Sequence, residues 1–198
     1  MAELRQVPLG ELCEVTVGPS GSLLENLHEG DDGIPVLTPS DLTPLHEVET
    51  DRLRRLPGRE AARLSRFALR QGDVLFVRQG ALGRVAVIMP EHSGWLYNSS
   101  CLRLRLRSDR VLPAFLALYL SRPMVLTNLL GQAPPGTVLW THAGTLRRQV
   151  VAVPPLPLQL AATKAVAAIN AQIKAQRALL TKLEYMGPAL FEEIFEDL

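Results

Sequence analysis

The sequence predicts a mixed α/β domain, of the α+β kind, followed by a long C-terminal helix. Two short apolar runs at 74–77 and 85–88 have the composition of a β-hairpin. Residues 101–107 alternate leucine with arginine, which is the period of a strand. Beyond a proline-rich stretch the composition shifts to good helix formers. We therefore expect a globular domain at 1–153 and a helical region at 154–198.

The composition is typical of a soluble globular protein, with 47% hydrophobic and 21% charged residues in a chain of 198. No apolar run approaches the ~18 residues needed to span a bilayer, and the N-terminus does not resemble a signal peptide. Cys13 and Cys101 lack the spacing of a zinc site or a disulfide framework. We expect a cytoplasmic protein with no membrane partner.

The N-terminal third combines short elements with polar loops. Residues 7–12 suggest a turn or short helix that leads into a strand at 13–17. The polar loop 18–22 is either a plain connection or a segment that becomes ordered on a ligand, and Ser20 is its candidate contact. Residues 33–38 predict a strand whose early proline favours a sheet edge or a buried strand end, followed by a turn.

Residues 57–70 are consistent with a short helix that carries a row of arginines, although residues 67–69 could equally be extended. Arg59, Arg63, Arg66 and Arg70 recur at spacings of 4, 3 and 4, which would align them on one face. A solvated face is the simplest interpretation of this row. Arg63 and Arg66 are also candidates for contact with a polyanion.

The hairpin carries a loop at 78–84 that contains two glycines and two arginines. Arginine offers a fork of donors that suits phosphate or guanine. Arg78, Gln79 and Arg84 are therefore candidates for contacts in a nucleic-acid groove, although an ordinary hairpin with solvated arginines remains an alternative. The neighbouring residues Gly72, Asp73, Gly80 and Gly83 are expected to be structural.

The strand predicted at 101–107 should turn its leucines inward and its arginines outward. The outward residues are Arg103, Arg105 and Arg107. Three adjacent cations repel one another, so a partner must offset the cost. We favour a phosphate backbone as that partner, while Asp41 or the acidic residues around Glu47 are the alternative.

The net charge of +1 conceals an uneven distribution. Residues 52–148 carry sixteen arginines and no lysine against four acidic residues, a net charge of +12. Residues 1–51 have a net charge of −10 and residues 149–198 of −1. The middle of the chain therefore resembles a polyanion-binding segment, unless the acidic N-terminal third folds against it.

The rest of the domain is predicted to hold helices at 112–120 and 124–131, a rigid connection at 133–137 and a final strand at 150–153. A helix then follows until Gly187-Pro188 breaks it. Its apolar residues follow an alternating 4, 3 spacing. This seam comprises Ala162, Val166, Ile169, Ile173, Gln176, Leu180 and Leu183. Such a seam favours a homodimer, with packing back on the same domain as the alternative.

The sequence gives little support for catalysis. The loop 78–84 is not a nucleotide-binding P-loop, and no arrangement typical of a nuclease metal site is present. His28, His46, His92 and His142 are isolated in the sequence. We therefore expect no catalytic residue, no metal and no cofactor. A small hydrolase that uses Cys13 or Cys101 is the weakest alternative.

Several short motifs occur together in a characteristic order. They are Val7-Pro8-Leu9-Gly10-Glu11-Leu12, Gly33-Ile34-Pro35-Val36, Leu69-x-x-Gly72-Asp73-Val74-Leu75 with Gly80-x-x-Gly83, Asn98-x-x-Cys101-Leu102, Phe115-Leu116-x-x-Tyr119-Leu120, Val153-Pro154-Pro155-Leu156-Pro157 and Leu190-Phe191. In this order and spacing, which cover nearly the whole chain, the sequence resembles one half of a type I restriction–modification specificity subunit.

The resemblance implies a target recognition domain at 1–153 and a coiled-coil-type spacer helix at 154–198. It implies a non-catalytic subunit that reads half of a bipartite site in double-stranded DNA. Partner methylase (M) subunits would methylate adenine there, and a motor and nuclease (R) subunit would cleave unmodified DNA.

The chain departs from the family pattern in two respects. Leu158-Gln159 stands where the family usually has Glu-Gln, and one recognition domain with one helix is present where full subunits have two of each. A homodimer would restore the two-fold arrangement and predicts a palindromic bipartite site. A repurposed half-subunit is one alternative. Another is an interaction or inhibitor module that binds methylase subunits through its helix without reading DNA.

Overall fold

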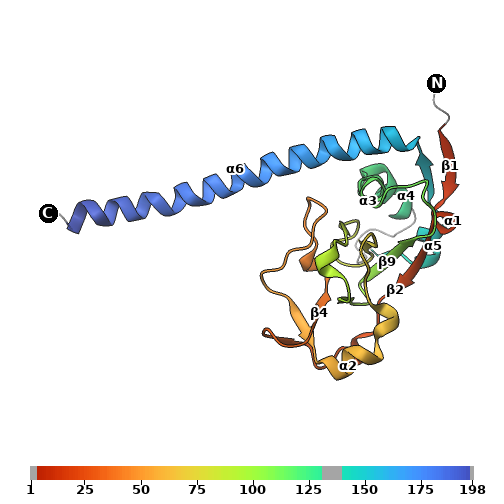
Figure 1. Cartoon of the computed structure of the whole chain (residues 1–198), viewed down its shortest axis with the longest axis horizontal. Helices are drawn as coiled ribbons and strands as arrows, with labels where there is room; N and C mark the ends of the chain where they lie inside the picture. The colour runs from red at the N-terminus through yellow and green to blue at the C-terminus, as the bar shows by residue number, and fades with distance from the viewer. Residues whose placement is uncertain (1–3, 131–139, 197–198) are drawn as a thin grey trace. The chain divides into compact units, whose positions relative to one another are not determined.

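The computed structural model describes residues 4–130 and 140–196 (Figure 1). The chain divides into two compact units, Met1–Leu160 and Ala161–Leu198. The first unit combines strands with short helices, and the second consists of helix. The first unit ends at Leu160 rather than at residue 153, because the first turn of the last helix is fastened to the α/β unit by a buried glutamine that is described below.

The order of elements agrees with the predicted α+β class. The described elements are β1 (Arg5–Pro8), α1 (Leu9–Leu12), β2 (Cys13–Val17), β3 (His28–Glu29), β4 (Ile34–Leu37), β5 (Arg54–Leu56), α2 (Gly58–Arg63), β6 (Val74–Val77), β7 (Val85–Val87), β8 (Leu96–Tyr97), β9 (Cys101–Leu106), α3 (Pro113–Leu120), α4 (Pro123–Leu130), α5 (Ala143–Arg148), β10 (Val150–Val153) and α6 (Leu156–Glu196).

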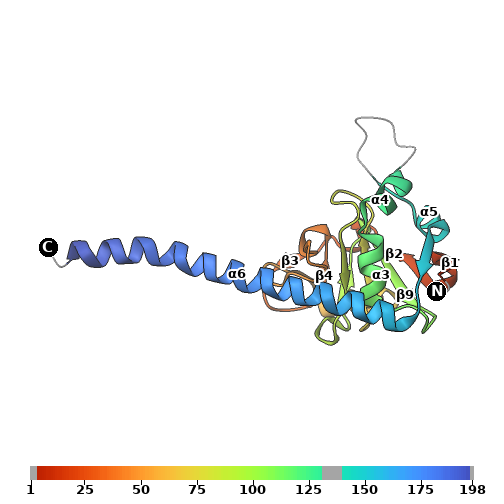
Figure 2. The same cartoon turned by 90° about the horizontal axis from the view of Figure 1, so that it is seen from above.

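These strands form three sheets. The central sheet has the order β2-β9-β6-β7 and is antiparallel throughout. A second sheet has the order β3-β5-β4-β8, in which only the β4–β8 pair is parallel among the described strands. The strands β1 and β10 pair separately, so the start of the domain is joined to its end. Both views show β1, α1 and α5 together at one end of this unit (Figures 1 and 2).

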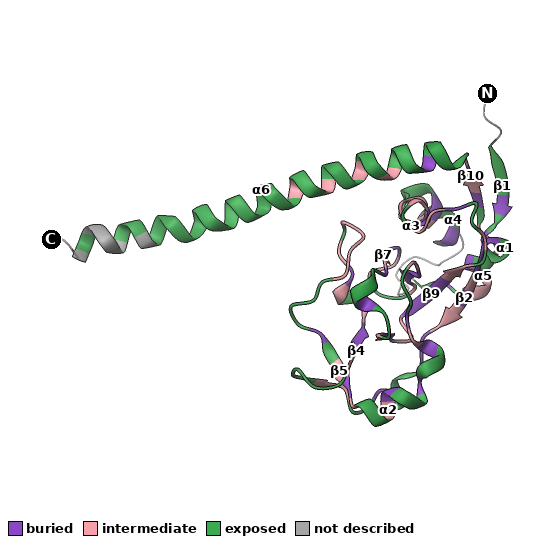
Figure 3. Ribbon diagram, viewed as in Figure 1, coloured by how far each residue is buried: buried purple, intermediate pink, exposed green. Residues whose placement is uncertain are grey.

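The central sheet is buried on both faces. On one face Val74, Phe76 and Leu104 pack with α3 and with the β1–β10 pair. On the other face Leu75 and Val77 pack with residues of the second sheet. All four residues of β6 are buried. Figure 3 shows buried segments in the labelled strands β4 and β9 of the two sheets. A strand that is covered on both faces has a continuous apolar sequence, and this is the pattern of 74–77.

The predicted hairpin is confirmed, since β6 and β7 pair in antiparallel fashion with Phe76 opposite Val85. The strand predicted at 33–38 is β4. Of the two positions expected for it, the sheet edge is wrong, because β4 has neighbours on both sides, and the buried strand end is confirmed, because Pro35 near its start is buried. Its proline is tolerated because Pro35 pairs only with Arg55, and the pairing with β8 begins one residue later, at Val36.

The helix predicted at 57–70 is shorter in the structure. The α-helix ends at Arg63, and a 3₁₀ turn follows at Ser65–Phe67. Leu64, Phe67 and Leu69 are all buried in the core on the side of the second sheet. The chain changes conformation here because these side chains follow the core surface rather than one stripe of a helix.

The predictions for the C-terminal part are largely confirmed by α3, α4 and β10. The connection predicted at 133–137 lies outside the described residues. The predicted break at Gly187-Pro188 is wrong, because α6 continues through Pro188. A proline inside a helix removes one backbone donor at a cost of roughly 3 kcal/mol, and Gly187 before it is also a poor helix former, so this pair weakens α6 locally without ending it.

Candidate nucleic-acid interface

The loop 78–84 is held in a defined conformation at the end of the buried hairpin. Gly83 N donates to the Val77 carbonyl over 3.1 Å, and Arg84 N donates to the Ala81 carbonyl over 3.1 Å. Gly80 and Gly83 have φ of +83° and +82°, a region that side chains other than glycine rarely adopt. The glycines are thus required by the shape of the loop, as the sequence predicted for them.

Arg78 and Arg84, at the two ends of this loop, differ in the burial and the hydrogen bonding of their side chains. Arg78 is half-buried, and its Nε donates to the Ser99 carbonyl over 2.6 Å. Arg84 is exposed, with one contact of 3.5 Å from Nη1 to the Leu42 carbonyl. Gln79 is exposed at the tip. Gln79 and Arg84 are therefore accessible to a groove, and Arg78 is anchored beside them.

A second segment, which the sequence analysis left without a role, lies against the loop. Trp140 forms an isolated antiparallel bridge with Gln79, and Thr141 N donates to the Arg78 carbonyl over 2.9 Å. The indole of Trp140 is 46% exposed, and its ring centroid lies 3.8 Å from that of His142. An aromatic pair thus borders the basic loop. In the sequence, this pair could have been noticed as a tryptophan two positions before a histidine.

Ser20 and Arg63, which were predicted from separate stretches, lie in one region. Ser20 Oγ is 3.0 Å from Ser22 Oγ in the N-terminal loop, and Asn26 Nδ2 donates to Glu60 of α2 over 2.8 Å. The loop and α2 border a pocket of about 280 Å³. Its lining residues are Ser22, Leu23, Asn26, Glu60, Arg63 and Leu64.

The arginines of this region are exposed, and the Arg66 guanidinium lies 4.7 Å from the centre of the Phe67 ring. Gly83 faces Leu126 of α4, so the hairpin loop lies on the α4 side of the unit. Figure 1 shows α2 and α4 at opposite ends of that unit. The structure therefore presents two separate basic surfaces. We call 78–84 with 140–142 the hairpin surface, and 20–26 with α2 and Arg66 the α2 surface.

The predicted outward row of arginines on β9 is wrong for Arg103. This side chain is 3% exposed and faces the segment at 65–69. Its Nη1 donates to the carbonyls of Arg66 and Ala68, and its Nη2 lies 3.5 Å from Glu14 Oε1. Its Nε is buried with no hydrogen-bond partner among the described residues.

Arg105 is likewise engaged inside the domain. Its Nε and Nη2 donate to the two carboxylate oxygens of Asp73 over 2.8 and 2.7 Å, in a bidentate pair. These hydrogen bonds raise the pKa of the Arg105 guanidinium. Asp73 is 2% exposed and also accepts from Arg70 N. The alternation placed the leucines of β9 on a covered face correctly, but it did not reveal that the arginine face is covered as well.

Arg107 differs from the other two arginines because its side chain is 63% exposed. Its Nη2 donates to Glu14 Oε2 over 3.0 Å, and this bond is the main cause of the lowered pKa of Glu14. Of the three arginines on this strand, Arg107 alone is accessible to an external phosphate.

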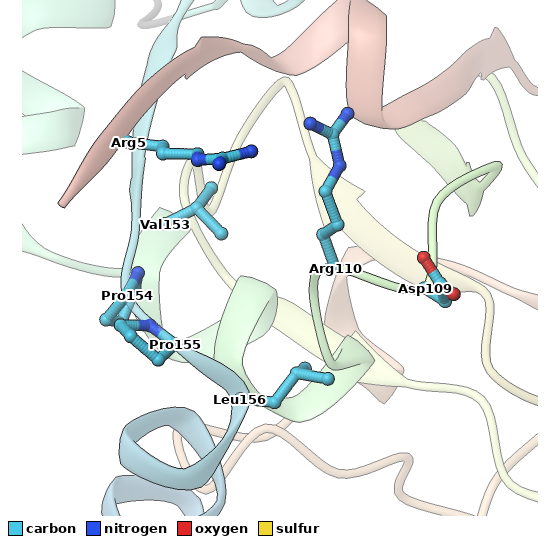
Figure 4. Close-up of a pocket in the computed structure, with 7 residues that line it drawn as sticks. All are labelled: Arg5, Asp109, Arg110, Val153, Pro154, Pro155 and Leu156. Carbon is cyan, nitrogen blue, oxygen red and sulfur yellow. The ribbon is translucent and has the colours of Figure 1, made fainter. Parts of the chain in front are cut away.

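A third region lies where α6 begins. Gln159 is fully buried, its Oε1 accepts from Leu112 N over 2.9 Å, and its Nε2 donates to the carbonyls of Arg110 and Pro154, each over 2.8 Å. A pocket of about 490 Å³ adjoins this junction. It is lined by Arg5, Asp109, Arg110, Val153, Pro154, Pro155 and Leu156. Figure 4 shows the guanidinium groups of Arg5 and Arg110 on the same side of the pocket. In the sequence, Gln159 stands out only as part of a departure from the family pattern.

The cysteines are poorly suited to nucleophilic catalysis. Cys13 and Cys101 are buried free thiols. Burial raises the pKa of Cys13 to about 12 and also raises the pKa of Cys101. Reactive cysteines need a lowered pKa, so the hydrolase alternative is not supported.

Two further features are absent from residues 4–130 and 140–196. No group of three or more His, Cys, Asp or Glu side chains is placed there to hold a metal ion. No helix in the same residues is long and apolar enough to cross a membrane.

The seam residues predicted on α6 lie on a continuous helix of 41 residues. Val166 and Ile173 are half-buried, and Gln176 is exposed. Ile169, Leu180 and Leu183 are 59%, 57% and 53% exposed. Apolar side chains on this helix are therefore accessible to a partner.

No protein-family model and no curated protein sequence matches the chain. Three solved structures are similar in fold. One comes from work on complex assembly and conformational transition of the type I R-M system, with 23% identity and a TM-score of 0.61 over 87% of this chain and 39% of that chain. The HsdS subunit from Thermoanaerobacter tengcongensis has 18% identity and a TM-score of 0.65 over 89% and 44%. The type I restriction-modification S subunit from M. genitalium has 15% identity and a TM-score of 0.60 over 93% and 43%.

These likenesses confirm the mixed α/β fold with a long C-terminal helix, and with it the resemblance in fold to type I restriction–modification S subunits. The chain spans about two fifths of the length of the structures that it matches.

Proposed function

We propose that this chain, which has the fold of type I restriction–modification S subunits, reads one half of a bipartite DNA sequence in the cytoplasm. In this role it would direct methylase and restriction subunits to the site and contribute no catalytic group. The observation that carries the proposal is the fold match over 87–93% of this chain against 39–44% of the S-subunit chains.

The hairpin surface is the proposed base-reading element. Gln79 is an exposed amide that can pair with adenine, and Arg84 is an exposed guanidinium that can pair with guanine. Arg78 supports them from its anchored position. The loop rests on a hairpin buried on both faces, so its side chains are presented by a rigid base.

Phosphate contacts are proposed for the exposed cations outside this loop. Arg63, Arg66 and Ser20 belong to the α2 surface, and Arg107 lies at the end of β9. Arg103 and Arg105 are assigned an internal role, because their guanidinium groups already bind carbonyl and carboxylate groups of the domain. Phosphate contacts would position the domain on the duplex, and the hairpin surface would specify the sequence.

We further propose that two chains pair through α6. At about 1.5 Å per residue, its 41 residues give a length of about 62 Å. Exposed apolar side chains recur along this length, Ile169, Leu180 and Leu183 among them. Two recognition domains related by a two-fold axis would read a palindromic bipartite site.

The test is selection from a random duplex pool by the purified protein at near-physiological salt, followed by sequencing. We expect enrichment of two inverted half-sites separated by a fixed spacer. Binding without enrichment would contradict sequence reading. Absence of binding that persists when M subunits are added would contradict the proposal as a whole.

A matched set of variants assigns the reading to the hairpin surface. Gln79→Ala and Arg84→Ala should each relax the selected sequence at one or two positions, because each removes a base contact worth about 1–3 kcal/mol. Arg52→Ala, an exposed arginine outside both surfaces, is the control and should leave the selected sequence unchanged. If all three variants select the same DNA sequence as the wild type, Gln79 and Arg84 do not read bases and the hairpin surface is not the base-reading element.

The interaction module is distinguished by the same reagents. Such a module would co-purify with M subunits and show no sequence preference, alone or in complex. A sequence-reading half-subunit keeps its preference in the complex.

A further inference from the structure

We propose that Trp140, whose ring contacts that of His142, forms an aromatic platform that stacks on a nucleobase. This base would lie next to the bases that the hairpin loop reads. The inference rests on the proposed DNA-reading function and adds a specific contact residue to it. Among the Phe, Tyr and Trp residues of the α/β unit within 4–130 and 140–160, Trp140 is the one with an exposed side chain.

The backbone next to Trp140 is hydrogen-bonded to the hairpin loop. Arg78 N donates to the Ser100 carbonyl over 2.9 Å, and the Arg78 carbonyl accepts from Thr141 N over 2.9 Å. Arg78, at the start of the loop, is therefore hydrogen-bonded through its backbone to Ser100 on one side and to Thr141 on the other. Thr141 is 2% exposed, so the residue between the two aromatic side chains is anchored in the domain.

The two rings support one another. Their centroids are 3.8 Å apart at an interplanar angle of 62°, an edge-to-face arrangement. His142 precedes the first turn of α5, which fixes its backbone. A large ring that is both exposed and fixed loses little conformational entropy when it binds a flat ligand.

The surroundings favour a nucleobase over an acidic or purely apolar partner. Residues 78–84 and 140–142 contain two arginines, a glutamine and a histidine but no carboxylate. The nearby Asp41 is turned into its own loop, where it accepts hydrogen bonds from Thr38 N and Oγ1. Cations and a flat aromatic ring together match a polyanion that carries stacked bases.

The first test uses fluorescence, because the chain has two tryptophans. Trp95 is half-buried against His92, with ring centroids 4.8 Å apart. In Trp95→Phe, Trp140 is the sole reporter, and stacking should quench its emission when a duplex from the selected pool is added. In Trp140→Phe, emission from Trp95 should stay unchanged at the same duplex concentration.

The second test measures affinity by fluorescence anisotropy of a labelled duplex. Trp140→Ala should weaken binding about tenfold or more, and Trp140→Phe should weaken it less, because a base–aromatic stack is removed or reduced. Trp95→Phe is the matched control and should bind as the wild type does. Equal melting temperatures for Trp140→Ala and the wild type would show that the loss is not due to unfolding.

The outcomes separate this inference from the proposed function. Wild-type protein that binds no duplex, alone or with M subunits, overturns both. Wild-type protein that binds and is matched in affinity by Trp140→Ala overturns the platform alone. Loss of M-subunit binding in Trp140→Ala, with DNA binding intact, would assign the indole to a protein partner and also overturn the inference.

Discussion

Gly80 and Gly83 share a left-handed backbone but have different surroundings. A Cβ atom on Gly80 would enter open space, whereas a Cβ atom on Gly83 would collide with the side chain of Leu126 on α4. Of these two glycines, Gly83 therefore combines a backbone requirement with a packing requirement, and Gly80 has the backbone requirement alone. This contact joins the hairpin loop to the helical layer of the domain.

Alanine substitutions at the two glycines should separate these effects. Gly80→Ala should lower the free energy of unfolding by about 1–2 kcal/mol, the cost of a left-handed alanine. Gly83→Ala should cost more, because it adds the collision with Leu126. The measurement is urea denaturation. The excess should shrink when Gly83→Ala is combined with Leu126→Ala, and an excess that is independent of Leu126 would contradict the packing argument.

The ion pair between Arg105 and Asp73 illustrates why the strand arginines are internal. Asp73→Asn would leave a guanidinium without its charged partner in a mostly buried site. Removing one member of a buried pair typically costs about 3–5 kcal/mol. Because the Arg105 side chain is 22% exposed, we expect the lower end of this range in thermal or urea unfolding. Asp109→Asn, at an exposed carboxylate, is the control, with an expected change within about 0.5 kcal/mol.

Glu14 should make a small contribution to stability that depends on pH. Its hydrogen bond from Arg107 lowers its pKa below the ordinary value of 4.5, so the folded state favours the ionised carboxylate. This contribution is present above the ordinary pKa and is lost as the pH falls through the lowered pKa. The melting temperatures of the wild type and Glu14→Gln should therefore differ slightly at neutral pH and converge in acid. A difference that persists in strong acid would contradict the assignment.

At the scale of elements, Gln159 decides how the first turn of α6 is attached. One side chain satisfies the Leu112 amide and the carbonyls of Arg110 and Pro154, so it fastens the helix start to the loop before α3. Glutamine suits this position because it offers both an acceptor and two donors.

Gln159→Ala should destabilise the domain by about 3 kcal/mol or more, because each buried polar group left unpaired costs about 1–3 kcal/mol. Urea unfolding measures the change. Gln176→Ala, on the exposed surface of the same helix, should alter the unfolding of the α/β domain little. Equal effects at the two positions would show that the hydrogen bonds of Gln159 are not what holds the turn.

At the scale of the whole molecule, the proposed pairing through α6 determines the symmetry of the DNA site. Leu180→Glu should shift the protein toward monomer, because it places a charge in the proposed apolar seam. Sedimentation velocity over a range of concentrations measures the shift. Ala178→Glu, about half a turn away from the seam residue Gln176, is the control and should leave the dimer intact. A wild type that is monomeric at all concentrations would remove the two-fold symmetry from the proposal.

The sequence by itself determined the elements whose pattern is local. The apolar arms of the hairpin, the alternation of 101–107 and the helix formers after residue 156 each specify backbone conformation over a few residues. The two glycines of loop 78–84 predicted a turn for the same reason, and both Gly80 and Gly83 adopt a positive φ in the structure. Local patterns therefore predicted the fold class and the hairpin loop 78–84, but not its neighbour at 140–142.

Only the tertiary structure decided which faces are covered and which distant residues meet. Periodicity places the arginines of β9 on one face, but the segment at 65–69 that covers that face is distant in sequence, so Arg103 became internal. The backbone bridge between Trp140 and Gln79 and the hydrogen bond between Gln159 and Leu112 likewise connect residues that are far apart in the sequence. Such contacts depend on how sheets and loops pack. The sequence does not show that a polar residue is buried when its hydrogen-bond partners come from distant parts of the chain.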